Sequence, residues 1–161
     1  MFGELGEGRN PKVKDNFLEK FSEYFDAEIC WLKWDMIYNM LGKTNLVISA
    51  VGLGGIPLQR LDREKAVETV RYALERGVNF IDTARGYTVS ESYIGAALAG
   101  GLRGDVVLAT KAPPTDRGGM LKEMEGSLKD LGTDYIDLYQ VHNVKDCASI
   151  DRVFGDDGAY K

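Results

Sequence analysis

Histidine and cysteine ligands for a metal ion are scarce in this sequence. Its 161 residues include a single histidine and two cysteines, Cys30 and Cys147, which lie far apart rather than in a C-x-x-C pair. A metal site built from four Cys or His ligands is therefore excluded. We predict that the chain holds no metal.

Long apolar runs and an excess of basic residues are absent as well. No run approaches the length that spans a bilayer, and the N-terminus lacks the short apolar core of a secretory signal. The formal net charge is -5, and the 20 basic residues are scattered rather than clustered. We therefore expect a cytoplasmic protein in a reducing compartment, with neither nucleic acid nor membrane as a partner. The 44% hydrophobic and 28% charged residues that are present are typical of an ordinary globular domain.

One plan recurs between residues 46 and 141: a short apolar strand, a polar loop, an amphipathic helix and a glycine at the helix end. The strands are predicted at 46–53, 78–82, 105–110 and 135–141. Helices are predicted after an Asp62 cap and after a Ser90 cap, and a third helix ends at Gly132. This alternation predicts an α/β protein with a parallel sheet. Four βα units are visible, whereas a complete (β/α)8 TIM barrel typically needs about 250 residues, so we expect a partial barrel.

The first part of the chain follows a different pattern. Between residues 17 and 41, apolar side chains recur at spacings of three and four, which favours an amphipathic helix. We expect this N-terminal helical extension to cover apolar surface rather than bind a membrane, because it carries too many acidic residues for an anionic lipid surface.

Four reactive side chains follow successive predicted strands. Asp82 ends the second strand, Tyr87 lies in the loop after it, Lys111 follows the third strand, and His142 follows the fourth. Each has a plain alternative: a turn cap, a packing tyrosine, a solvated lysine and a structural histidine. The C-terminal strand ends of a barrel share one face, so together the four side chains favour a common pocket.

These residues lie in segments that resemble the aldo-keto reductase family. Segment 79–91 reads NFIDTARGYTVSE and is followed by IGAAL at 94–98, which is similar to the signature around the family's catalytic Asp and Tyr. ATK at 109–111 resembles its lysine motif, DYIDLYQVH at 134–142 the segment that leads to its histidine, and GLGGIP at 52–57 its opening glycine motif. The sequence of these motifs is most similar to that of a bacterial and archaeal branch of the family. The resemblance covers about residues 36 to 154, so we predict an extension at 1–35 and the N-terminal half of a barrel at 36–161, opening with a hairpin at 36–49.

The resemblance implies NADPH-dependent reduction of a small carbonyl substrate. Tyr87 would donate the proton, and the Lys111 ammonium would ease that transfer. Asp82 would orient Lys111, and His142 would donate a hydrogen bond to the carbonyl oxygen. Gly55, Ile56 and Asp82 are the expected cofactor contacts. The family's main cofactor residues come from the last four strands, which this chain lacks, so we expect NADPH to bind weakly or not at all.

Two other interpretations remain open. The family includes regulatory subunits of potassium channels, so the chain could be a non-catalytic binding module. It could also be a half-barrel that self-associates, because its first and fourth strands would be open edges. In that interpretation the inward-facing residues Val51, Ile81, Val107 and Leu138, or their neighbours, lack an opposing half of the barrel.

Overall fold

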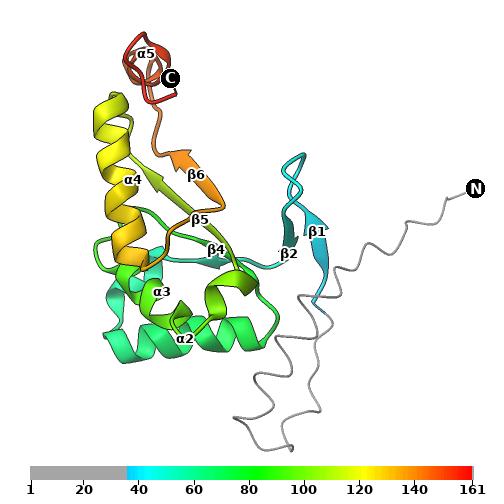
Figure 1. The fold of residues 1–161 in the computed structure, drawn as a ribbon. Helices are drawn as coiled ribbons and strands as arrows, with labels where there is room; N and C mark the ends of the chain where they lie inside the picture. The colour runs from blue at the N-terminus through cyan, green and yellow to red at the C-terminus, as the bar shows by residue number, and fades with distance from the viewer. Residues whose placement is uncertain (1–35, 161) are drawn as a thin grey trace, which may run out of the picture. The chain divides into compact units, whose positions relative to one another are not determined.

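The computed structural model describes residues 36–160 (Figure 1). The predicted extension at 1–35, with its helix from about residue 17, lies outside the described residues. The described strands are β1 (Tyr38–Met40), β2 (Val47–Ser49), β3 (Leu53–Gly54), β4 (Phe80–Asp82), β5 (Val107–Ala112) and β6 (Leu138–Val141). The α-helices are α2 (Arg63–Glu75), α3 (Ser90–Leu98), α4 (Arg117–Leu131) and α5 (Cys147–Phe154), and two 3₁₀ helices are η2 (Ile56–Arg60) and η3 (Leu102–Asp105).

The first two strands form the expected hairpin. They pair antiparallel, with Tyr38 opposite Ser49 and Met40 opposite Val47, and the turn between them places Gly42 and Asn45 at positive φ. The single strand predicted at 46–53 is wrong, because β2 belongs to this hairpin and β3 belongs to the main sheet. The Ser49 hydroxyl donates to the carbonyl oxygen of Val51, and the Ser49 amide donates to the Asn79 side chain. These bonds turn the chain between the two sheets.

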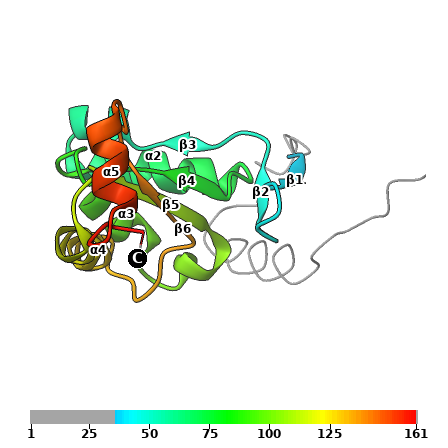
Figure 2. The same ribbon diagram turned by 90° about the horizontal axis from the view of Figure 1, so that it is seen from above.

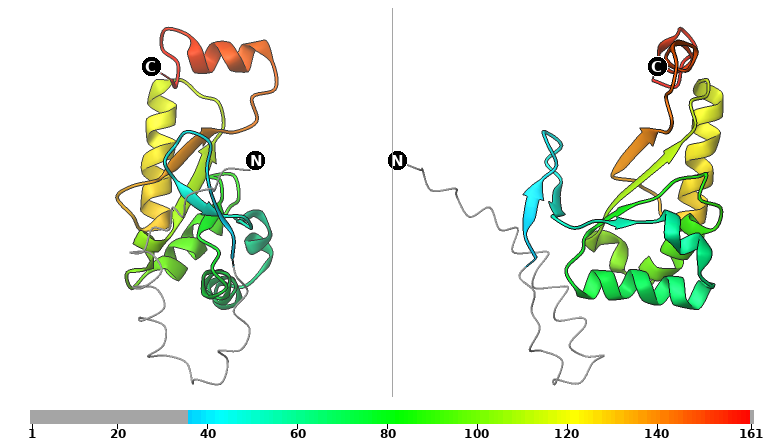
Figure 3. Two further views of the ribbon diagram at one scale, coloured as in Figure 1. Left: turned by 90° about the vertical axis from the view of Figure 1, so that its right-hand side faces the viewer. Right: turned by 180° about the vertical axis from the view of Figure 1, so that it is seen from behind.

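The main sheet has four parallel strands in the order β3, β4, β5, β6, which lie side by side in Figure 2. The register pairs Leu53 with Ile81, Phe80 with Val107, and Ala109 with Leu138. A helix follows each strand, and α2, α3 and α4 lie on one side of the sheet (Figure 3). The predicted α/β architecture with four βα units is confirmed.

Local capping signals explain most of the helix boundaries. The Asp62 carboxylate accepts a hydrogen bond from the Lys65 amide at the start of α2, as predicted. Helix α4 ends at Leu131, and Gly132 caps it with φ 64, the left-handed conformation that glycine adopts readily. The predicted Ser90 cap is wrong: α3 begins at Ser90 itself after Val89, without a side-chain cap.

The core lies between the sheet and these three helices. Ile81 and Leu108 are fully buried, together with helical residues that include Ala66, Val70, Ile94 and Leu131. Neighbouring residues of a strand point to opposite faces, so Phe80 and Asp82 lie on the other face. The sequence left open whether Ile81 or a neighbour faces the barrel interior, and it is Phe80 that lies on the Asp82 face of the sheet.

The other three residues predicted to face the interior differ in their position. Val107 and Leu138 share the Asp82 face by register and are half-buried, as expected. Val51 lies in the bend between β2 and β3 and is 60% exposed, so its predicted interior position is wrong. Across residues 36–160, none of the helices is both long and apolar enough to cross a membrane.

Candidate active site

An ion pair lies where β4 and β5 end. Asp82 is the last residue of β4, and Lys111 precedes the last residue of β5. The Lys111 ammonium donates to Asp82 Oδ2 at 2.5 Å and to the Thr83 carbonyl oxygen at 2.8 Å. The Lys111 side chain is only 12% exposed, so the alternative of a solvated loop charge does not hold. Gln140 on β6 donates to the other carboxylate oxygen of Asp82 at 3.3 Å.

Tyr87 and His142 lie beside this ion pair. The Lys111 ammonium is 5.3 Å from the centroid of the Tyr87 ring, within cation–π range. The centroids of the Tyr87 and His142 rings are 5.8 Å apart, and the ring planes are nearly perpendicular at 86°. The structure therefore brings together all four residues that the sequence singled out. They come from three strand ends and one loop.

Backbone hydrogen bonds fix the loop that carries Tyr87. The Thr83 amide donates to the Ala109 carbonyl oxygen at 2.9 Å, and the Arg85 amide donates to the Lys111 carbonyl oxygen at 3.0 Å. These bonds continue the pairing between β4 and β5 beyond the end of β4. The Tyr87 amide then donates to the Ala84 carbonyl oxygen, which closes a turn and places the ring above Lys111.

Gly55, one of the expected cofactor contacts, is buried and packed against side chains. Its amide donates to the Asp82 carbonyl oxygen, and its carbonyl oxygen accepts from the Ser90 hydroxyl at 2.8 Å. Ser90 uses its only hydroxyl proton there, so Thr83 is the donor in the 2.9 Å bond between the two hydroxyls. The Ser90 side chain thus binds the β3 loop across 35 residues of sequence instead of capping α3.

Gly54 and Ile56, on either side of Gly55, are exposed rather than buried. Ile56 is 48% exposed, and a Cβ placed on Gly54 would meet no atom within 4 Å. Gly54 is in register with Asp82, so the open space beside it lies on the same face of the sheet as the Asp82 carboxylate. Sequence reasoning did not single out Gly54, although it lies within the GLGGIP motif.

Sequence reasoning also missed an ionic cluster beside the site. Arg85, between Asp82 and Tyr87, contacts three carboxylates, those of Glu91, Glu123 and Asp130. Burial by itself would lower the pKa of Arg85, but its hydrogen bonds to Asp130 and Glu91 raise that pKa above the ordinary value. The only signal in the sequence was that Arg85 is a charged residue three positions after the end of β4. Nothing in the motif distinguished Arg85 from the residues beside it.

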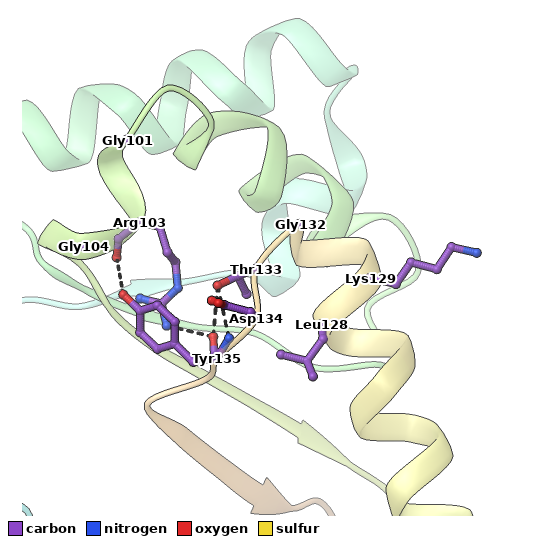
Figure 4. Close-up of a pocket in the computed structure, with 9 residues that line it drawn as sticks. All are labelled: Gly101, Arg103, Gly104, Leu128, Lys129, Gly132, Thr133, Asp134 and Tyr135. Carbon is purple, nitrogen blue, oxygen red and sulfur yellow. Dashed lines mark hydrogen bonds between the residues drawn. The ribbon is translucent and has the colours of Figure 1, made fainter.

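A separate depression lies at the other end of the sheet. There the Arg103 guanidinium lies 3.8 Å from the centroid of the Tyr135 ring (Figure 4). Arg103 also pairs with Asp137 at 2.7 Å. This place is near the start of β5 and β6, whereas Lys111 is near the end of β5. The depression is therefore distinct from the candidate active site. Its lining consists of Gly101, Arg103, Gly104, Leu128, Lys129, Gly132, Thr133, Asp134 and Tyr135.

Comparison with known proteins identifies the family of the described unit. Residues 50–156 match the model of the aldo/keto reductase family. The aldo-keto reductase YhdN of Bacillus subtilis (strain 168) is 38% identical over 125 residues, which are 66% of this chain and 38% of YhdN.

Two solved structures share this fold. The holo form of an aldo-keto reductase from Bacillus halodurans, AKR11C1, has a TM-score of 0.62 and 33% identity, over 66% of this chain and 40% of that one. An aldo/keto reductase from Klebsiella pneumoniae, in complex with NADP and acetate, has a TM-score of 0.57 and 33% identity, over 60% of this chain and 36% of that one. The chain thus spans less than half the length of these relatives, and its sheet corresponds to part of their barrel.

Proposed function

The chain belongs to the aldo/keto reductase family, and on that premise we propose that it reduces the carbonyl group of a small substrate with NADPH. The observation that carries this proposal is the position of the Lys111 ammonium. It is held by Asp82 and by a backbone carbonyl, and it lies 5.3 Å from the centroid of the Tyr87 ring.

Tyr87 is the proton donor in this proposal. Carbonyl reduction leaves negative charge on the substrate oxygen, and a phenol within hydrogen-bond reach neutralises that charge by proton transfer. The Lys111 ammonium stabilises the phenolate that Tyr87 becomes. Asp82 accepts hydrogen bonds from both Lys111 and Gln140, which holds the carboxylate in place and keeps Lys111 directed at the ring.

His142 orients the substrate. Its ring lies edge-on to Tyr87, so a carbonyl oxygen that reaches the phenol also lies near the imidazole. A hydrogen bond from the imidazole would fix the direction of approach and stabilise the developing charge.

The cofactor would lie along the Asp82 face of the sheet. A reduced nicotinamide supplies the hydride that a carbonyl carbon accepts in this reaction. Gly54 leaves open space beside Asp82, and the exposed Ile56 offers apolar surface next to it. Gly55 holds this loop in place, because both of its backbone polar groups are bonded. The Klebsiella relative with NADP bound supports NADPH as the cofactor. A cytoplasmic location also suits the free, exposed Cys147 thiol.

A chimaera tests this proposal. Residues 36–154 would replace the matching part of the YhdN relative, and the loss of NADPH absorbance would be followed with small aldehydes. We expect turnover in the chimaera and a large loss of turnover, about 100-fold or more, in the same chimaera carrying Tyr87→Phe. A folded chimaera that binds NADPH but reduces no aldehyde would contradict the proposal.

A second proposal concerns the isolated chain. Strands β3 and β6 are the edges of the described sheet, and the half-buried Phe80, Val107 and Leu138 lie on its Asp82 face. Open strand edges pair readily with other strands, and this face presents apolar side chains beside the ion pair. We propose that two copies of the chain associate through the edge strands β3 and β6 and through the Asp82 face of the sheet.

A further inference from the structure

Arg85 binds to three other parts of the structure. Its Nη1 donates to Glu91 Oε2 at 2.5 Å and to Asp130 Oδ2 at 2.6 Å, and its Nε donates to Glu123 Oε2 at 3.3 Å. Its backbone amide donates to the carbonyl oxygen of Lys111. The residue therefore joins the β4–α3 loop to α3, to α4 and to the end of β5.

The Glu91 carboxylate is a fixed anchor for this guanidinium. Its side chain is 2% exposed, and its second oxygen accepts a hydrogen bond from the Thr110 hydroxyl at 2.8 Å. Thr110 is itself fully buried and precedes Lys111 on β5. A buried carboxylate with both oxygens bonded has little freedom to move, so Arg85 is tied to the rigid part of the sheet.

Helix α4 makes room for the guanidinium. A Cβ placed on Gly126 would lie 2.9 Å from Nη2 of Arg85, closer than real Cβ contacts. Glu123 and Asp130 lie on the same helix, at i−3 and i+4 from Gly126, and both face Arg85. The three carboxylates and the space beside Gly126 therefore fit a planar guanidinium group with several N–H donors. The single ammonium group of a lysine would not fit them in the same way.

The Arg85 backbone lies between the two groups that the reaction needs. Its amide fixes the main chain of Lys111, and two residues later the chain places the Tyr87 ring over the Lys111 ammonium. Gly86, between Arg85 and Tyr87, is exposed and has no atom within 4 Å of a built Cβ. Around Gly86 the loop is held from two sides: by Arg85 before it, and after it by the bonds from the Tyr87 amide to the Ala84 carbonyl oxygen and from the Ser90 amide to the Tyr87 carbonyl oxygen. Of these anchors, only the Arg85 side chain ties the loop to α4.

We propose that Arg85 is a positioning residue that sets the Tyr87 ring against His142 and above Lys111. The proposal rests on the proposed function only for the role of Tyr87 as proton donor. The position of the ring is a property of the chain by itself, without cofactor or substrate.

The single histidine of the chain makes this position measurable. The imidazole proton signals in an NMR spectrum of the untagged chain belong to His142 alone. The perpendicular contact at 5.8 Å means that the Tyr87 ring shifts these signals. The displacement of the His142 signals by Tyr87→Leu therefore reports how closely the two rings are held.

A double-mutant cycle gives the test. In an Arg85→Met background, the displacement caused by Tyr87→Leu should be smaller by about twofold or more than in the wild-type background. Arg85→Lys should restore only part of it. An equal displacement in the wild-type and Arg85→Met backgrounds would overturn the proposal.

Arg103→Met is the matched control, because Arg103 likewise pairs with a carboxylate, that of Asp137, but lies beyond the far end of β5. This variant should leave the displacement unchanged. An equal reduction in Arg103→Met would mean general loosening of the fold and would also overturn the proposal.

A milder variant decides the matter if Arg85→Met does not fold. Glu123 and Asp130 are 38% and 40% exposed, so Glu123→Gln with Asp130→Asn changes the periphery of the cluster and leaves Glu91 in place. The displacement should fall in this variant, and an unchanged displacement would overturn the proposal. None of these outcomes depends on turnover, so a chain without reductase activity would refute the proposed function and leave the positioning test intact.

Discussion

Replacing Gly55 with alanine tests how the β3 loop is fitted to the active-site loop. The new Cβ would lie 2.7 Å from Ser90 Oγ, 2.8 Å from Thr83 Oγ1 and 2.9 Å from Thr83 Cβ. Both hydroxyl side chains are fully buried, so neither can turn away into solvent. The backbone itself accepts alanine, because φ at Gly55 is -77. Any loss of stability would therefore come from packing and hydrogen bonding.

The magnitude follows from these contacts. Overpacking of a buried site typically costs about 1–3 kcal/mol. Weakening the hydrogen bond between Ser90 and the Gly55 carbonyl adds about 1 kcal/mol. Alanine also restricts the unfolded chain, which returns about 0.4–1 kcal/mol. The free energy of unfolding should fall by about 1–4 kcal/mol in Gly55→Ala.

Gly54→Ala is the control, since its Cβ would meet nothing within 4 Å. Its free energy of unfolding should stay equal or rise by up to about 1 kcal/mol, because only the unfolded-state term applies. Urea unfolding followed by circular dichroism measures both variants. Equal midpoints for Gly54→Ala and Gly55→Ala would refute this account of the loop.

Four further outcomes are expected. In the chimaera described above, Tyr87→Phe should lower turnover about 100- to 10,000-fold while NADPH binding survives, and near-normal turnover would contradict its role as the acid. Deletion of residues 1–35 should leave the thermal melt nearly unchanged, because β3–β6 and their buried helices form a core of their own; a large loss of cooperativity would refute this. The isolated chain should sediment as a dimer or larger species and bind NADPH weakly, whereas a stable monomer with micromolar affinity would contradict both expectations. Hydrogen bonds from Lys65 lower the pKa of Asp62 in the folded chain. The contribution of Asp62 to stability is therefore present above its unfolded pKa and is lost as the pH falls through its folded pKa. Asp62→Asn should flatten this dependence of stability on acid pH, as measured by thermal melts at a series of pH values.

The choice of reactive side chains could be predicted from the sequence. Asp82, Lys111 and His142 each follow an apolar strand pattern, and parallel strands end on one face, so their convergence follows from topology. Tyr87 comes with them because only four residues separate it from Asp82. Contacts such as Lys111 with Asp82 confirm that the four lie together, while their roles in catalysis stay predictions.

Ser90 and Asp62 show where local patterns stop being sufficient. Both are good capping residues before an apolar helix, and a helix cap is predicted at each of them. The Asp62 side chain caps α2, but the Ser90 hydroxyl binds the Gly55 carbonyl oxygen, which becomes its neighbour only when β3 pairs with β4. A tertiary partner outcompeted the local one.

The sequence by itself determined the alternation of strands and helices, because periodicity and caps act within a few residues. Only the tertiary structure decided that residues 46–53 divide between two sheets and that, of Ile81 and its neighbours, Phe80 lies on the Asp82 face of the sheet. A shift of one residue reverses the faces of a strand, and the pairing that sets it lies in a distant segment. The Arg85 cluster likewise joins residues up to 45 positions apart, so its geometry exists only once α3 and α4 pack against the sheet.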